Sequence, residues 1–544
     1  MKRLLTVAAA AALIFALFAC DKPLPDSSGK YILNSEGEAV IDGVDMTFCD
    51  PEPGNERVFY EIFVGSFSDS DGDGIGDLRG IINRFDYLND GDPASGVSLG
   101  VEGIWLTPVF RSSSYHKYNV IDYYGIDPDF GTEDDFKELI SLCHERGVKL
   151  IIDLPINHTS ELNQWFIKFA SSHREGDTES EYYGFYSYYT EGEAAPAGRQ
   201  FKKVSGTDIY YECNFADSMP ELDFDNDKVR AAVLDVAKHY LEMGVDGFRF
   251  DAAKYIYLGD NAKSAEFWKW YVGELRKISP DVYTVAEVWD SDGITDKYFG
   301  ATDCFNFTTS QSSGLIASTA DAGNVNTYTS YVEKYVERVK SERESAMLVS
   351  FLTNHDMDRA AGFLPAASGN NFVAANLYLL TPGSPFIYYG EELGMRGSRG
   401  AASTDANRRL AMLWGDGDTV KNPEGSTYPA SSQTENTVES VKGDGDSLYN
   451  HYKKLIMVRK ANPEIACGKY TALSFENTKL GGFISTADSG TVCVIHNTTA
   501  RELSVDLSEV TDISFGGITA YLGGDATLDG NLLTISAKTS VVLR

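Results

Sequence analysis

Residues 247–251 read GFRFD, and this stretch decides the fold. Side chains alternate along a strand, so Arg249 and Asp251 face one way while the two phenylalanines face the other. Three other strings share this design, because each ends or follows an apolar, β-prone run and delivers a carboxylate: DLPINH at 153–158, AEVW at 286–289 and TNHD at 353–356. Strands that each present a polar group at their C-terminal end indicate a barrel of parallel strands with its active site there.

Strand-like and helix-like segments alternate along most of the chain, as such a barrel requires. The strand-like runs are 58–64, 103–106, 148–153, 244–251, 282–287, 346–352 and 385–389. Helical patterns lie at 134–146, 227–243, 262–278 and 328–341, and a closing helix is expected at 447–461. We therefore predict the α/β class, with a (β/α)8 TIM barrel over residues 55–462.

One connection is too long for a single crossover and indicates a functional insertion. Between about 158 and 221 we find no simple helix, but a tyrosine-rich patch at 182–189 and turns rich in Gly and Ala. We expect a small excursion domain there, after the third strand. Residues 463–544 show short alternating strands, which predict a C-terminal antiparallel β-sandwich.

Composition bounds the class of protein. The 544 residues are 43% hydrophobic, which is typical of a globular chain with large cores. The formal net charge of −33 disfavours phosphate backbones, so we expect no nucleic-acid partner. Solubility alone also explains that charge. The cysteines after residue 20 are scattered without metal spacing and are expected to be buried free thiols: Cys49, Cys143, Cys213, Cys304, Cys467 and Cys493.

The N-terminus is typical of an export signal rather than of the fold. Residues 1–20 begin with the basic MKR, continue in an apolar run too short for a membrane span, and end in LFAC. That ending resembles the lipobox of bacterial lipoproteins, which implies lipidation of Cys20 and anchoring at the bacterial cell envelope or surface. A plain secretory signal is the alternative, and either one implies export. Residues 21–54, rich in Pro, Gly, Ser and acids, are expected to be a tether.

In order and spacing, the four strings closely resemble the signature regions of the α-amylase family of glycoside hydrolases. The resemblance covers about 57–544 and implies retaining hydrolysis through a covalent glycosyl-enzyme. It assigns Asp251 as nucleophile, Glu287 as general acid/base and Asp356 as the third essential carboxylate. Arg249 would hold Asp251 ionised, although a buried Arg-Asp pair without a catalytic role gives the same pattern. Apolar neighbours, with Trp289 a candidate, would raise the pKa of Glu287.

The resemblance also implies a set of substrate-binding residues. In the family, equivalents of Tyr118 stack on the sugar at the cleavage site, and equivalents of Lys254 meet the sugar beyond it. The full set that we predict to bind substrate is Tyr118, His116, His158, Arg249, Lys254, His355 and Trp165. Asp153 is expected to support Arg249. The tyrosine-rich patch is explained by packing within the excursion domain, or else by stacking on sugars along a groove.

Residues 69–77 read DSDGDGIGD and predict a structural Ca²⁺ site. The expected ligands are Asp69, Asp71, Asp73, Asp77 and the carbonyl of Ile75. The string resembles a calcium loop of many α-amylase family members but is no EF-hand, because its twelfth position is Gly80. An acidic surface turn is the alternative.

A second, family-typical calcium site would use Asn157. Its histidine ligand is absent from this chain, which reads Lys254-Tyr255 where the family often has Lys-His. The sequence therefore leaves that second site in doubt.

Lys254, the anchor and the moderate excursion domain favour an endo-acting α-amylase on extracellular starch, maltodextrin or glycogen. Neopullulanase, α-glucosidase, oligo-1,6-glucosidase and glucanotransferase activities of the same family remain alternatives. From another class, the chain could be an inactive glucan-binding lipoprotein, against which stand the intact carboxylates Asp251, Glu287 and Asp356. We expect a monomer whose only membrane contact is the lipid anchor.

Overall fold

A parallel sheet forms the centre of the computed structural model, which describes residues 56–92, 96–321 and 323–544 and short strands between 24 and 46. Seven strands lie in the order β15-β14-β13-β9-β6-β5-β16. Their bounds are β5 Phe59–Ile62, β6 Gly103–Leu106, β9 Lys149–Leu154, β13 Gly247–Phe250, β14 Tyr283–Ala286, β15 Asp303–Cys304 and β16 Phe386–Tyr388.

An eighth segment closes this sheet into a barrel. Phe305 forms a parallel bridge to Val349, and Phe351 forms one to Phe386. Eight segments thus follow one another around the barrel in chain order, which confirms the predicted (β/α)8 fold. The strand expected at 346–352 is present only as these bridges. The two-residue strand β15 was not predicted, because so short a run carries no pattern.

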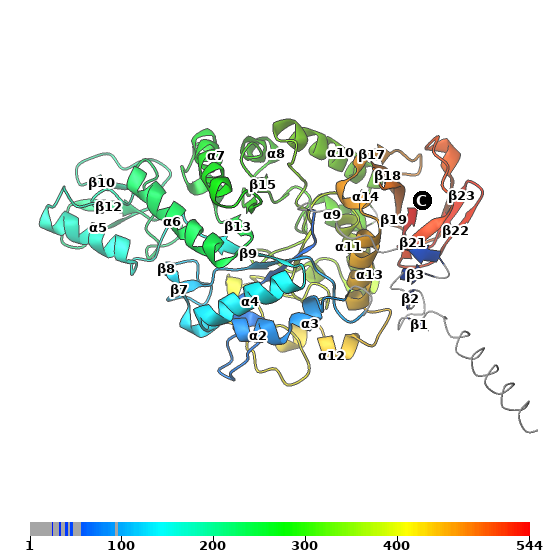
Figure 1. The fold of residues 1–544 in the computed structure, drawn as a ribbon, viewed down its shortest axis with the longest axis horizontal. Helices are drawn as coiled ribbons and strands as arrows, with labels where there is room; N and C mark the ends of the chain where they lie inside the picture. Colours follow the sequence, from blue (N-terminus) through cyan, green and yellow to red (C-terminus); the bar gives the residue numbers. More distant parts are fainter. Residues whose placement is uncertain are drawn as a thin grey trace, which may run out of the picture.

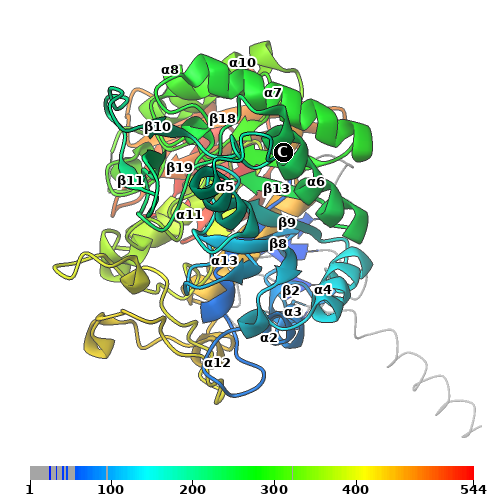
Figure 2. The same cartoon turned by 90° about the vertical axis from the view of Figure 1, so that its left-hand side faces the viewer.

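Helices surround the barrel (Figures 1 and 2). The longer ones are α4 Glu133–Glu145, α6 Asp227–Met243, α7 Asn261–Ile278, α10 Val325–Glu342, α11 Asn370–Leu379 and α13 Leu448–Ala461. Helix α4 shows how the sequence sets their bounds. The Thr132 hydroxyl and the Asp135 carboxylate form a reciprocal capping box at its start, and the buried Phe136, Leu139 and Ile140 form its inner face.

Inside the barrel, an apolar layer lies below a polar one. Phe59 stacks on Phe386 with ring centroids 4.6 Å apart, and Trp105 lies against Phe305 at 5.5 Å. Because residues two apart on a strand share a face, three segments that supply this layer also supply the polar layer above it. The pairs are Phe59 and Glu61, Ile151 and Asp153, and Val285 and Glu287.

The excursion domain projects from the barrel after β9 and faces the viewer in Figure 2. It contains α5 Gln164–Glu175 and the antiparallel sheet β10-β12-β11, with β10 Tyr188–Thr190, β11 Phe201–Lys203 and β12 Ile209–Glu212. The expectation that this insertion has no helix is wrong. The Asn163 side chain caps α5, and Gly176 ends it in the left-handed conformation, so both end signals were present in the sequence.

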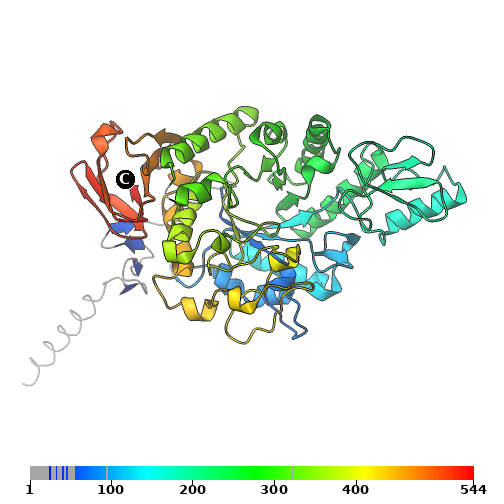
Figure 3. The ribbon, with the colours of Figure 1, turned by 180° about the vertical axis from the view of Figure 1, so that it is seen from behind.

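The C-terminal region consists of two antiparallel sheets at the opposite end of the molecule (Figure 3). The first has the order β17-β18-β19-β24-β21, with β17 Lys469–Leu473, β18 Leu480–Ala487, β19 Gly490–Asn497, β21 Ile518–Leu522 and β24 Ser540–Leu543. The second has the order β20-β23-β22, with β20 Leu503–Asp506, β22 Ala526–Asp529 and β23 Leu532–Ile535. A shared apolar cluster that includes Ile495, Leu533 and Val541 joins them.

The segment expected to be a tether contains a small antiparallel sheet. Its strands are β1 Leu24–Pro25, β2 Ile32–Leu33, β3 Ala39–Ile41 and β4 Val44–Met46, and β3 and β4 contact β21. The tether prediction overlooked Asp42-Gly43, a dipeptide typical of hairpin connections. The predicted signal peptide, Cys20 and Cys49 lie outside the described residues. Within the described part of the chain, no helix is long and apolar enough to cross a membrane.

The five cysteines within the described ranges are all free. Cys143, Cys213, Cys304 and Cys493 are buried, as expected of structural thiols, but Cys467 is exposed.

Candidate active site

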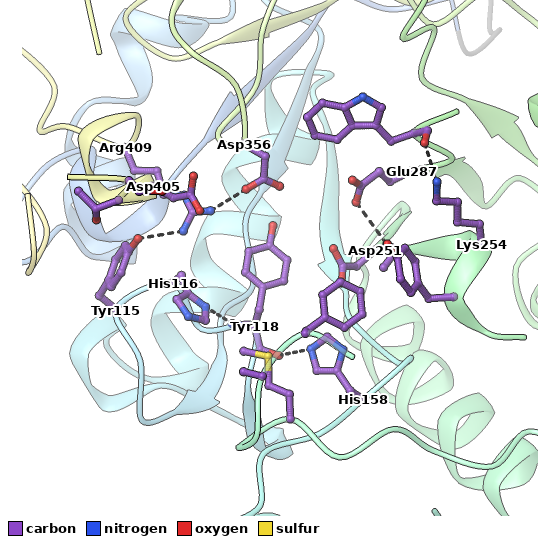
Figure 4. Close-up of a pocket in the computed structure, with 18 residues that line it drawn as sticks. Tyr115, His116, Tyr118, His158, Asp251, Lys254, Glu287, Asp356, Asp405 and Arg409 are labelled. Carbon is purple, nitrogen blue, oxygen red and sulfur yellow. Dashed lines mark hydrogen bonds and ion pairs between the residues drawn. The ribbon is translucent and has the colours of Figure 1, made fainter. Parts of the chain in front are cut away.

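A cavity of about 670 Å³ opens at the C-terminal ends of the barrel strands (Figure 4). Asp251 follows β13, Glu287 follows β14, and Asp356 follows the closing segment 349–351. All three carboxylates line the cavity. The parallel strands therefore gather at one mouth the groups that more than 100 residues separate in the sequence.

Arg249 lies fully buried at the centre of the site. Its Nη1 donates to Asp153 Oδ1 at 2.8 Å and to Asp251 Oδ1 at 2.7 Å. Its Nη2 donates to Glu287 Oε2 at 2.6 Å. One guanidinium thus holds two of the predicted catalytic carboxylates and the predicted supporting residue. Such charge-assisted hydrogen bonds fix orientation as well as charge.

The surroundings of Glu287 raise the pKa of its carboxyl group above the ordinary value. Burial raises its pKa, Arg249 opposes that rise, and the negative charges of Asp251 and Asp356 add to it. A carboxyl with a raised pKa keeps its proton to higher pH than an ordinary glutamate, which suits a general acid. Trp289, the expected apolar neighbour, lines the cavity and stacks on Phe307 with centroids 5.0 Å apart.

Asp356 lies between two cations and has the opposite electrostatics. Arg409 Nη2 approaches its Oδ1 at 2.6 Å, and His355 Nε2 approaches its Oδ2 at 3.1 Å. Burial alone would raise the pKa of Asp356, but His355 and Arg409 outweigh burial and hold it well below its ordinary value. Asp356 is therefore an ionised carboxylate at the cavity wall.

His355 is a buried cation in a chain of hydrogen bonds. Its Nδ1 donates to Glu61 Oε1 at 2.5 Å, and its Nε2 donates to the Tyr118 hydroxyl at 2.7 Å. Burial by itself would lower the pKa of His355, but Asp356 and Glu61 raise it to about 10. The Tyr118 hydroxyl in turn donates to Asp153 Oδ2 at 2.8 Å. The hydrogen bonds to His355 and Asp153 therefore fix the orientation of Tyr118, the tyrosine predicted to stack on the sugar.

The remaining predicted substrate residues come from three different loops. His116 lines the cavity, and burial lowers its pKa to about 3, so it is neutral. His158 Nε2 lies 3.2 Å from the Tyr118 carbonyl oxygen. Lys254 Nζ donates to the Trp289 carbonyl at 2.8 Å on the Glu287 side of the cavity.

Trp165 is not among the residues that line the cavity. It lies at the start of α5 and packs on Tyr123 and Phe185, with centroids 5.4 and 5.7 Å away. The prediction that it binds substrate does not fit this position. Proximity in sequence to β9 suggested the role, but helix α5 places the partly buried indole between Tyr123 and Phe185.

Glu61 and Arg409 are among the residues of the site that sequence reasoning missed. Glu61 gave a usable signal, because a carboxylate inside the apolar run 58–64 is costly to bury without a partner. Arg409 gave none, since it belongs to a polar loop after β16 whose path is set by tertiary contacts. Its Nε donates to the His355 carbonyl and its Nη1 to the Tyr115 hydroxyl, both at 3.1 Å.

The acidic loop after β5 fits a divalent cation in part as predicted. Asp69, Asp71 and Asp77 each offer a carboxylate oxygen, and these atoms lie within 4.8 Å of one another. Like charges so close repel unless a cation lies between them, and carboxylate oxygens suit Ca²⁺. Asp73 is outside this group, and its carboxylate accepts from the Ile75 backbone N–H at 2.6 Å.

Comparisons with known proteins agree with this geometry. The family model "Alpha amylase, catalytic domain" matches residues 61–468. Alpha-amylase 3 of Dictyoglomus thermophilum is 37% identical over 81% of this chain and 84% of its own. A 4-alpha-glucanotransferase of Thermotoga maritima is 31% identical over 82% of this chain and 96% of its own. The solved structure of Eubacterium rectale Amy13B aligns with a TM-score of 0.82 and 33% identity, covering 91% of this chain and 96% of that one.

Proposed function

The chain belongs to the α-amylase family of glycoside hydrolases, and from that premise we propose that it cleaves internal α-1,4-glucosidic bonds of starch, maltodextrin or glycogen. The single observation that carries the proposal is the group of Asp251, Glu287 and Asp356 around one open cavity, two of them held by Arg249. The acidic surface does not oppose binding of a neutral glucan.

In the first step, Asp251 attacks the anomeric carbon and forms a covalent glycosyl-enzyme. Glu287 donates its proton to the leaving oxygen, a role to which its raised pKa is suited. Asp356 accepts hydrogen bonds from the hydroxyls of the distorted sugar. His355 does not line the cavity, and from its fully buried position it keeps Asp356 ionised and oriented.

In the second step, Glu287 takes a proton from water as the water oxygen attacks the anomeric carbon. The bond to Asp251 breaks and returns the carboxylate to the Arg249 guanidinium. Attack on opposite faces in the two steps gives retention of configuration.

Calcium would have a structural role in this proposal. Asp69, Asp71 and Asp77 would hold the ion, and the carbonyl of Ile75 stays a predicted ligand. Asp77 also caps helix α2, Leu78–Asn83, through a hydrogen bond from Gly80 N at 2.6 Å. The ion would therefore tie the loop after β5 to the first helix of the barrel.

Export and a lipid anchor at Cys20 complete the proposal, with the substrate outside the cytoplasm. The lipobox string and the apolar run before it support this location. Metabolic labelling with a fatty acid, in the wild type and in Cys20→Ala, tests it. If the wild type is not labelled, the alternative of a plain secretory signal without lipidation would be favoured.

The test of activity is a product time course on soluble starch and on pullulan, with Glu287→Gln as the matched variant. We expect a ladder of maltooligosaccharides from starch, little from pullulan, and a loss of at least about 10²-fold in kcat for Glu287→Gln. Glucose, panose or maltotriose as the sole product would favour the exo-acting, neopullulanase or α-1,6 alternatives. If no product forms and the protein still binds starch, the alternative of an inactive glucan-binding lipoprotein would be favoured.

A further inference from the structure

A second cavity, of about 400 Å³, lies at the end of the barrel opposite the catalytic site. Several residues that line it start barrel strands: Lys149 is the first residue of β9, Tyr283 of β14 and Asp303 of β15. Parallel strands start at one end of a barrel and finish at the other, so the packed interior separates this basal cavity from the catalytic one. Its volume is within the range of about 300–1,000 Å³ that is usual for small-molecule sites.

The basal cavity is rich in cations although the chain is acidic. Arg57, Lys149, Arg276 and Arg343 line it together with only two carboxylates. The chain as a whole has the opposite balance, with 47 Lys and Arg against 80 Asp and Glu. A concave site with an excess of positive charge attracts negatively charged ligands.

Two of these four cations have a carboxylate partner. Arg343 Nη2 pairs with Asp303, and Lys149 Nζ pairs with Asp246 Oδ1 at 2.8 Å. The other carboxylate of the cavity, Asp281, is exposed to solvent. Neutralisation of the cavity by its own side chains is therefore incomplete.

Arg57 and Arg276 supply the charge that remains, because neither forms an ion pair with a described residue. Arg57 Nη1 donates to the Gly147 carbonyl at 3.1 Å, and Arg276 Nη2 donates to the Ala301 carbonyl at 3.4 Å. Burial and the positive charge of Arg343 both lower the pKa of Arg276. Cations that lie so close to one another repel unless an anion lies between them.

Two buried polar atoms of the cavity residues also have no hydrogen-bond partner within the described part of the chain. They are Arg57 Nε and the hydroxyl oxygen of Tyr283. The Tyr283 side chain is 3% exposed, and its ring stacks on Phe59 with centroids 4.9 Å apart, which fixes its position. A buried donor without a partner costs about 1–3 kcal/mol, so a ligand that accepts from it is favoured.

We propose that the basal cavity binds a phosphate group, either as free phosphate or as the phosphate ester of a small molecule. The oxygens of a phosphate accept hydrogen bonds from the guanidinium groups of Arg57 and Arg276 and from the Tyr283 hydroxyl. Its charge of about −2 matches the two cations that have no carboxylate partner. The inference is independent of the proposed function, because this cavity shares no lining residue with the catalytic one.

The test is isothermal titration calorimetry of the full-length protein at constant ionic strength. The ligands are inorganic phosphate and glycerol 3-phosphate, with glycerol as the uncharged control. We expect both phosphate ligands to bind at one site per chain and glycerol not to bind. Tighter binding of glycerol 3-phosphate would support an ester as the ligand, and tighter binding of inorganic phosphate would support the free ion.

Three variants locate the site. Arg276→Gln should weaken phosphate binding about tenfold through the loss of a charge-assisted hydrogen bond, and its exposed position on α7 favours normal folding. Tyr283→Phe removes only the unpartnered hydroxyl, so it should weaken binding about fivefold without lowering the Tm of the free protein. Lys277→Gln is the matched control, because Lys277 follows Arg276 on α7, pairs with Glu274 at 2.7 Å and does not line the cavity. Its affinity for phosphate should equal that of the wild type.

Two results would overturn the proposal. The first is the absence of binding of either phosphate ligand to the wild type. The second is equal affinity in the wild type, Arg276→Gln and Tyr283→Phe, because phosphate would then bind elsewhere. Starch hydrolysis measured on the same samples reports on the proposed function separately, so that a failure of one is distinguishable from a failure of the other.

Discussion

Arg409→Met removes one of the two cations that hold Asp356 ionised, and keeps a side chain of similar length. Arg409 Nη2 lies 2.6 Å from Asp356 Oδ1. With charge centres about 4 Å apart and an effective dielectric constant of about 20, the pair is worth at most about 4 kcal/mol. At about 1.4 kcal/mol per factor of ten in an equilibrium constant, that is an upper limit of about 10³-fold on the shift of Asp356 toward its protonated form. His355 remains beside it, and partial exposure weakens the pair, so we expect the pKa of Asp356 to rise with an effect below this limit.

The consequence is a change in the pH dependence of the reaction. A depressed pKa keeps Asp356 ionised well into the acid range, and the variant would lose this ionisation at higher pH. We expect the acidic limb of kcat/KM on maltooligosaccharides to lie at higher pH in the variant than in the wild type, with a smaller change near neutral pH. Arg399→Met is the control, because Arg399 pairs with Asp405 at 2.8 Å rather than with Asp356. An acidic limb at the wild-type pH in Arg409→Met would refute the reasoning.

Three further predictions concern metal, packing and pH. A Ca²⁺ concentration one hundredfold above Kd should stabilise the wild type by up to about 3 kcal/mol, and Asp69→Asn should lose most of this stabilisation. A chelator should therefore lower the Tm of the wild type but not that of the variant. An equal fall in Tm in the wild type and the variant would contradict the calcium site. Trp165→Ala should lower the free energy of unfolding by about 2–4 kcal/mol, because its indole packs on two aromatic rings, and the folded enzyme should keep its KM for starch. A raised KM at unchanged stability would instead show that Trp165 binds substrate. Burial raises the pKa of Glu391 to about 7, above its value in the unfolded chain. The unfolded chain therefore loses this proton first, and the free energy of unfolding falls as the pH rises from about 4.5 to 7. Glu391→Gln should reduce this slope by up to about 1.4 kcal/mol per pH unit, and an unchanged slope would refute the prediction.

The sequence alone determined the barrel and its main catalytic candidates, for a local reason. The period-two alternation of GFRFD places Arg249 and Asp251 on one face, and parallel strands end at one mouth. Asp251, Glu287 and Asp356 were therefore expected at one mouth, and the resemblance of the four strings to the α-amylase family assigned their catalytic roles. Local sequence also marked both ends of helix α5, with Asn163 as the cap at its start and Gly176 at its end. These two signals were present in the sequence but were overlooked.

Tertiary structure alone decided what surrounds these carboxylates. Arg409 and Phe215 reach the cavity from loops with no periodic pattern, because contacts between distant segments fix where such loops run. Trp165 shows the converse, since its place near β9 in sequence did not bring it to the substrate cavity. Electrostatics follows the same rule. The pKa of Glu287 is raised by burial and by the charges of Asp251 and Asp356, which lie on other segments. The pKa of Asp356 is lowered by its sequence neighbour His355 and by Arg409, and only the fold brings Arg409 to it and Glu61 to His355.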